Sequence, residues 1–113
     1  MNDISWTEAL GAAVTVIGKD GIILQMNARA RDTFASEGGG ALVGKSVYDC
    51  HPESAQRKLR QMMQSQQPNH YTISKRGQRK IIHQMPWFQD GAVAGFVEIS
   101  IPIPDAMEHF DRG

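Results

Sequence analysis

The sequence predicts a single α+β domain in which a five-stranded antiparallel sheet carries helices packed on one face. Three observations predict this class. The chain has 113 residues, a length that supports one hydrophobic core and not two. Apolar residues alternate at both ends of the chain, whereas the spacing typical of a helix is confined to the middle. Two strands followed by helices and then by three strands is the order of an α+β domain.

The first two strands are expected to form a hairpin. Residues 12–18 are rich in β-branched residues, which suit a pleated surface. Asp20-Gly21 then predicts a tight turn, because glycine accepts the positive φ that such a turn needs. Residues 22–26 are therefore expected to be the returning strand.

Helices are expected in the middle of the chain. Asn27 can cap a helix over residues 28–36, because its side-chain oxygen can accept a bond from a backbone amide. Residues 37–44 are rich in glycine and are expected to form a loop. A longer amphipathic helix is expected over residues 53–66, where apolar residues recur at helical spacing.

The end of the chain predicts three strands joined by hairpins. They cover residues 70–76, 79–89 and 92–103. In the last of them the apolar residues share one face, while Glu98 and Ser100 point to the other. This alternation predicts a half-buried strand with one wet side.

The composition excludes several classes of protein. Hydrophobic residues make up 41% of the chain and charged residues 21%, which is too apolar for a disordered protein. No stretch approaches the roughly 18 apolar residues of a membrane span, and Asp3 stands where a secretion signal would carry bases. Cys50 is the only cysteine, so no internal disulfide can form. We therefore expect a cytoplasmic protein that makes no membrane contact.

The charges are unevenly distributed along the chain. Lys+Arg and Asp+Glu both number 12, and the formal net charge is zero. Between Glu53 and Asp90, however, the chain has seven bases and no acid. Such a segment attracts anions, so we expect an acidic protein partner or an anionic ligand to contact a basic face formed by Arg57, Arg60, Lys75, Arg76, Arg79 and Lys80. Nucleic acid is not expected, because few aromatic residues accompany these bases.

Several of these features stand in the order and spacing of a known family, and the chain resembles a PAS (Per-Arnt-Sim) sensor domain. The matching features are Asp20-Gly21 in the first hairpin, Asn27 before the first helix, LVGKS at 42–46, the amphipathic helix, and Asp90-Gly91 in the last hairpin. DCHPES at 49–54 is similar to a branch with a Cys-His-Pro sequence before this helix. The resemblance covers a domain at residues 12–103, between an N-terminal flank at 1–11 and a C-terminal tail at 104–113.

The resemblance implies a curved sheet that cups a small cavity, with a ligand or cofactor in some members and frequent dimerisation. PAS domains are mostly non-catalytic and report to an output module. We therefore expect a sensory domain without enzymatic activity that binds a small molecule, forms a homodimer or contacts a protein partner. A ligand-free interaction module is one alternative, and a haem or redox sensor that uses His51 is another. No defined motif supports haem or flavin, so the cofactor stays open.

Two groups of residues are candidates for ligand contact. His51 could bind haem iron, or it could only bond to local backbone at the start of the long helix. Together with Cys50, His70 and His83 it makes no zinc-binding pattern, so no metal site is expected. The core residues Leu59, Met62, Met63 and Phe96 could also line a cavity.

The second group lies on one strand. His83, Met85 and Trp87 share a strand face with Ile81. We expect this face to look into the cup, where His83 would orient a ligand in an apolar pocket. If the face looks outward, the same residues form a surface patch.

Gly39 to Ser46 also matches the phosphate-binding pattern GxxxxGK(S/T). That loop follows a buried strand in nucleotide hydrolases, whereas a helix is expected before it here. Nucleotide hydrolysis is therefore not expected.

Overall fold

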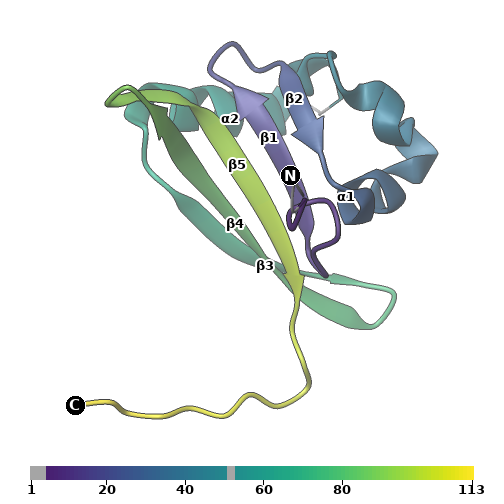
Figure 1. The fold of residues 1–113 in the computed structure, drawn as a ribbon, viewed down its shortest axis with the longest axis vertical. Helices are drawn as coiled ribbons and strands as arrows, with labels where there is room; N and C mark the ends of the chain where they lie inside the picture. Colours follow the sequence, from purple (N-terminus) through teal and green to yellow (C-terminus); the bar gives the residue numbers. More distant parts are fainter. Residues whose placement is uncertain (1–4, 51–52) are drawn as a thin grey trace, which may run out of the picture.

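The computed structural model describes residues 5–50 and 53–113 and confirms the predicted α+β class. The elements follow the expected order: β1 (Ala13–Gly18), β2 (Ile23–Met26), α1 (Ala28–Thr33), the 3-10 turns η1 (Ala35–Glu37), η2 (Gly39–Leu42) and η3 (Val47–Cys50), α2 (Glu53–Ser65), β3 (Asn69–Lys75), β4 (Gln78–Gln89) and β5 (Ala92–Pro102). The strands form one antiparallel sheet in the order β2-β1-β5-β4-β3. In Figure 1 α1 and the short turns lie beyond β2, α2 crosses behind the top of the sheet, and the tail leaves the fold after β5.

The first hairpin forms as its turn chemistry predicts. Asp20 accepts a hydrogen bond from the backbone N–H of Ile22 at 3.1 Å, which closes the turn locally. Gly21 has a φ of 86°, and a Cβ at this position would lie 2.5 Å from the Tyr48 ring. Glycine is therefore required here both by the turn and by the close approach of Tyr48.

The first helix is shorter than the predicted 28–36. It ends at Thr33, and the segment that follows consists of the short turns η1 and η2 in place of an open loop. Gly38 between these turns and Gly39 at the start of η2 have φ values of 126° and 53°. These conformations interrupt a helix at little cost only because both residues are glycine.

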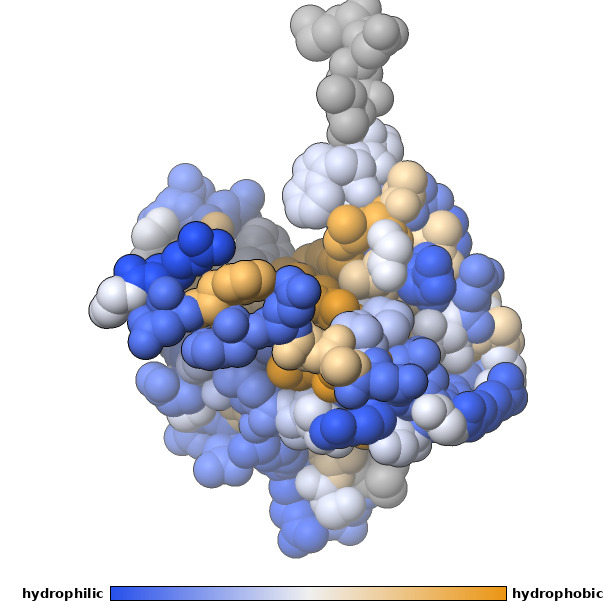
Figure 2. All heavy atoms as spheres, turned by 90° about the horizontal axis from the view of Figure 1, so that it is seen from below, coloured by the Kyte–Doolittle hydropathy of each residue, from blue (hydrophilic) through white to orange (hydrophobic). Residues whose placement is uncertain are grey.

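The hydrophobic core lies between the β1–β2 half of the sheet and the helical layer. Its buried members are Ala13, Ile17, Ile23, Met26, Ala30, Leu42, Val47 and Leu59. At the other edge of the sheet, β3 has six exposed residues out of seven. The space beneath the β3–β4 half is thus less completely filled. Seen from below, the molecule shows apolar residues in its middle and hydrophilic residues around them (Figure 2).

One side chain joins the first strand, the first helix and the N-terminal segment. Asn27 is 3% exposed. Its Oδ1 accepts from the N–H groups of Val14 and Ala30, both at 2.9 Å. Its Nδ2 donates to the carbonyl oxygens of Thr7 and Ala12, both at 2.8 Å. The predicted helix cap is confirmed, and the same side chain ties two further segments to it.

Across the described ranges, 5–50 and 53–113, no helix combines the length and the apolar character that a membrane crossing requires.

Candidate functional site

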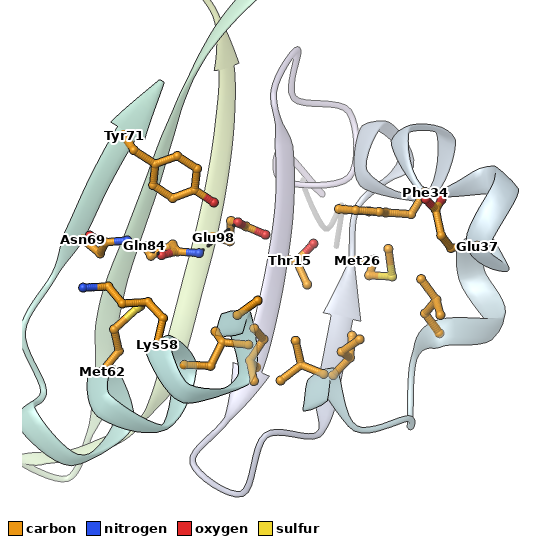
Figure 3. Close-up of a pocket in the computed structure, with 16 residues that line it drawn as sticks. Thr15, Met26, Phe34, Glu37, Lys58, Met62, Asn69, Tyr71, Gln84 and Glu98 are labelled. Carbon is orange, nitrogen blue, oxygen red and sulfur yellow. Dashed lines mark hydrogen bonds between the residues drawn. The ribbon is translucent and has the colours of Figure 1, made fainter. Parts of the chain in front are cut away.

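A cavity of about 420 Å³ lies between the helical layer and the sheet. Figure 3 shows side chains from both ends of the chain reaching into it. One half of its lining is apolar and is formed by core residues of β1, β2 and α2, among them Ile17, Ile23, Met26 and Leu59. The other half is polar, with Asn69, Tyr71, Gln84 and Glu98 on the last three strands. Thr15, Glu37 and Lys58 add polar groups from β1, η1 and α2. The cavity is therefore amphipathic, as small-molecule sites commonly are.

The polar half is built as a row across three neighbouring strands. Asn69 of β3 is opposite Gln84 of β4, and Gln84 is opposite Glu98 of β5. The Asn69 amide donates to Gln84 Oε1 at 2.9 Å, and the Gln84 amide donates to Glu98 Oε1 at 3.1 Å. Each donor thus points along the row toward the carboxylate. A carboxylate accepts several hydrogen bonds, so Glu98 is the natural partner for a donor group inside the cavity.

Tyr71 and Lys58 stand beside this row. Figure 3 shows the Tyr71 hydroxyl on the side of Glu98, and the Lys58 side chain of α2 extending toward Asn69. Burial, and to a lesser extent the negative charge of Glu98, raise the pKa of Tyr71 above its usual value. The tyrosine is therefore a neutral hydroxyl at pH 7, able both to donate and to accept a hydrogen bond.

Of the predicted candidates within the described residues, only two line the cavity. Leu59 and Met62 of α2 do so, and a ligand contact by either stays a prediction. Met63 packs against the core, and Phe96 is 2% exposed, but neither lines the cavity. His51 lies outside the described residues.

The expected orientation of His83, Met85 and Trp87 is wrong. Adjacent residues of a strand point to opposite faces, and Gln84 lines the cavity. His83, Met85 and Trp87 consequently lie on the outer face of the sheet. The hydrophobic pattern could not reveal this, because β4 carries apolar residues on both faces, with Ile82 inward at 5% exposed.

The polar row was not predicted. Glu98 was assigned to the wet side of its strand, and that side faces the cavity. Asn69, Gln84 and Glu98 are spread over thirty residues of sequence. They become neighbours only through the register of two hairpins, so the turn positions were the one signal that could have aligned them.

An antiparallel sheet that cups a ligand-sized cavity beneath a helical layer defines a class of small sensory domains. The family model described as PAS fold matches residues 7–106. The chain therefore belongs to the PAS family. Comparison with curated proteins gave no match.

Solved structures show the same fold at low sequence identity. The PAS domain of the histidine kinase ThkA has a TM-score of 0.62 at 20% identity, covering 80% of this chain and 97% of that chain. The Aer2 receptor from Vibrio cholerae, described as a dual PAS-haem oxygen sensor, has a TM-score of 0.61 at 14% identity, covering 82% and 95%. VqmA bound to DPO has a TM-score of 0.69 at 11% identity, covering 89% of this chain and 56% of that chain. PAS domains thus occur in histidine kinases and other sensors.

Proposed function

We propose that this PAS domain is a non-catalytic cytoplasmic sensory module that binds a small molecule in the cavity between α2 and the sheet. The observation that carries the proposal is the row Asn69–Gln84–Glu98 beside an apolar half-cavity. The volume of about 420 Å³ falls within the range of roughly 300–1,000 Å³ usual for such sites. VqmA, a neighbour in fold, is described as bound to DPO, which supports a binding role for this fold.

The lining favours one chemical class of ligand. The apolar half favours a compact aromatic or aliphatic body, and the row ends on an acceptor that carries negative charge. We therefore propose a small, mainly apolar molecule with an N–H, O–H or cationic group directed at Glu98.

The proposed response begins at α2. A ligand in the cavity contacts Leu59 and Met62 on one side and the sheet on the other, so its binding favours one packing of α2 over another. A ligand shifts a two-state equilibrium only by its difference in affinity for the two states, and the α2 contacts are the ones that can differ. The output partner then binds differently to the two positions of α2.

The carboxylate of Glu98 is expected to determine ligand affinity. Replacing Glu98→Gln keeps the side-chain shape and removes the charge, and so should weaken binding by about tenfold or more, because charge-assisted hydrogen bonds contribute roughly 1.5–3 kcal/mol. Native mass spectrometry of the protein purified from cells identifies a retained ligand, and titration calorimetry with that compound gives the affinities. Glu108→Gln in the exposed tail is the matched control and should bind as the wild type does.

Two outcomes would replace this proposal. If the protein carries only its bare chain mass, and no compound in a small-molecule library shifts the NMR signals of the cavity residues, the domain is a ligand-free interaction module. If the purified protein shows a Soret band, it is a haem sensor. Haem ligation by histidine would depend on His51, because none of the described residues that line the cavity is a histidine or cysteine.

We propose, in addition, that an acidic protein partner contacts the β3–β4 hairpin. The six bases of the predicted face divide into two groups, since α2 with Arg57 and Arg60 lies at the top of the sheet in Figure 1 and the hairpin at the bottom. Arg60 lies over the Tyr48 ring at 4.6 Å. The hairpin bases Lys75, Arg76 and Lys80 instead line an open groove that also includes Thr33, Ser36 and one acid, Asp32.

Charge reversal at the hairpin tests this contact. A poly-glutamate peptide should shift the NMR signals of residues 75–80, and the double change Lys75→Glu with Arg76→Glu should abolish these shifts. The binding should also weaken with added salt, which screens exposed charges. The control Arg57→Glu with Arg60→Glu should leave the shifts intact, and equal losses in both variants would contradict a specific hairpin site.

Homodimerisation is part of the proposed function, and sedimentation of the purified chain tests it.

A further inference from the structure

Two histidines face each other on the outer side of the sheet. His70 of β3 is directly opposite His83 of β4. Their Nδ1 atoms are 2.7 Å apart, and their ring centroids are 4.9 Å apart with an angle of 70° between the planes. His70 is exposed and His83 half-buried, so the pair is open to solvent on the side away from the cavity.

The short contact fixes how the two rings share a proton. A neutral imidazole carries one N–H and one bare nitrogen, so one of the two Nδ1 atoms donates and the other accepts. Two ring nitrogens held at this distance are also a bidentate arrangement for a metal, because neutral imidazole is a common metal ligand.

We propose that His70 and His83 form a chelating site for a divalent first-row transition metal that prefers tetragonal coordination, with Cu²⁺ as the best fit. Metal–imidazole bonds are about 2.0 Å long, so two nitrogens at a right angle around one ion lie about 2.8 Å apart. The two atoms are 2.7 Å apart where they share a proton, so a small turn of each ring brings them to that separation. A tetrahedral ion such as Zn²⁺ would need about 3.3 Å between the same atoms, and Cu²⁺ binds more tightly than Zn²⁺ to a given set of nitrogen ligands.

Binding requires only a small rearrangement. The terminal torsion of histidine is broad, so both rings can turn their Nδ1 lone pairs toward one point. The proton that the pair shares moves, through solvent, to the Nε2 of the ring that donated it, and the ion takes its place with no net proton release. Within residues 5–50 and 53–113 no group of three or more His, Cys, Asp or Glu could hold a metal ion, so water completes the coordination.

The site lies directly behind the polar row of the cavity. The pair His70–His83 is followed in the ladder by Asn69–Gln84 on the opposite face. An ion bound to both histidines cross-links the edge strand β3 to β4 at this point, and it thereby holds the two strands in the register that aligns Asn69 with Gln84.

Titration with CuCl₂ in a weakly coordinating buffer tests the site. The wild type should bind one Cu²⁺ with an electron paramagnetic resonance spectrum that shows two nitrogen ligands. His70→Ala and His83→Ala should each weaken binding about 100-fold, because the second bond of a chelate forms intramolecularly, and each should leave a single-nitrogen spectrum. His109→Ala in the exposed tail is the control and should bind as the wild type does.

A measurement on the unchanged protein guards against misfolded variants. Paramagnetic Cu²⁺ should broaden the NMR signals of His70 and His83 before those of His109. Broadening that begins elsewhere, or equal affinities of the wild type and both variants, would rule the site out. Binding of Zn²⁺ as tight as that of Cu²⁺ would contradict the right-angled geometry.

Discussion

Replacing Gly95 with alanine is expected to prevent folding or to lower the free energy of unfolding by about 3 kcal/mol or more. Gly95 has a φ of 154°, a conformation that side chains rarely adopt. An added Cβ would overlap the carbonyl oxygen of Ile17 and would lie 2.8 Å from its carbonyl carbon. Both atoms belong to the backbone of β1, which pairs with β5 at this point. Strain at a special backbone position is one of the few causes of large losses in stability.

The neighbouring contacts leave little room for relaxation. The Ile17 carbonyl oxygen also accepts a hydrogen bond from the Trp87 indole at 3.2 Å, and the β4–β5 register shifts immediately after Trp87. A displacement of β1 would therefore disturb the ladders on both sides of β5. Phe96, which follows Gly95, is 2% exposed, and any shift of Gly95 would also move this buried side chain.

Urea denaturation followed by circular dichroism measures this effect. Gly11→Ala is the matched control, because no atom lies within 4 Å of a Cβ at that position. It should change the free energy of unfolding by no more than about 0.5 kcal/mol. Equal stability of the Gly95→Ala and Gly11→Ala proteins would show that β1 can shift away from β5 at little cost.

The elements that follow from local chemistry were predicted from the sequence. Asp20-Gly21 and Asp90-Gly91 set the turns, and Asn27 set the start of α1, because each of these signals acts through a few neighbouring atoms. The close approach at Gly95 depends on a residue 78 positions away in sequence, Ile17, and no local pattern encodes it.

The candidate site divides in the same way. Leu59 and Met62 could be predicted because helical spacing alone places them on the buried face of α2. The face of β4 that lines the cavity could not be predicted in this way. Hydrophobicity shows which face of a strand is buried only where the other face is polar. Here the inward face carries Gln84 and the outward face carries Trp87, so the rule selected the wrong side.

Replacing Asn27 with alanine is expected to lower the free energy of unfolding by about 2–4 kcal/mol, since buried backbone groups lose their hydrogen-bond partner. Two N–H groups and two carbonyl oxygens bond to this side chain. Met26, its neighbour in sequence, lines the cavity, so ligand binding should weaken as well. Asn69→Ala is the control for the stability measurement, because one hydrogen bond joins that side chain to Gln84 at 2.9 Å. Its loss should cost no more than about 1 kcal/mol.

The change Asn27→Asp separates the hydrogen bonds that the side chain accepts from those that it donates. The carboxylate can still accept from the N–H groups of Val14 and Ala30, but it would place a second oxygen against the carbonyl oxygens of Thr7 and Ala12. Only the protonated acid can donate there, so folding should raise the pKa of the new carboxyl above its unfolded value. The folded state then binds more protons than the unfolded state, and the stability of the variant relative to the wild type should rise as the pH falls toward that pKa. Urea denaturation of both proteins at neutral and mildly acidic pH measures this. A stability difference that does not change with pH would mean that the donor half of Asn27 contributes nothing, and that its role is that of a helix cap alone.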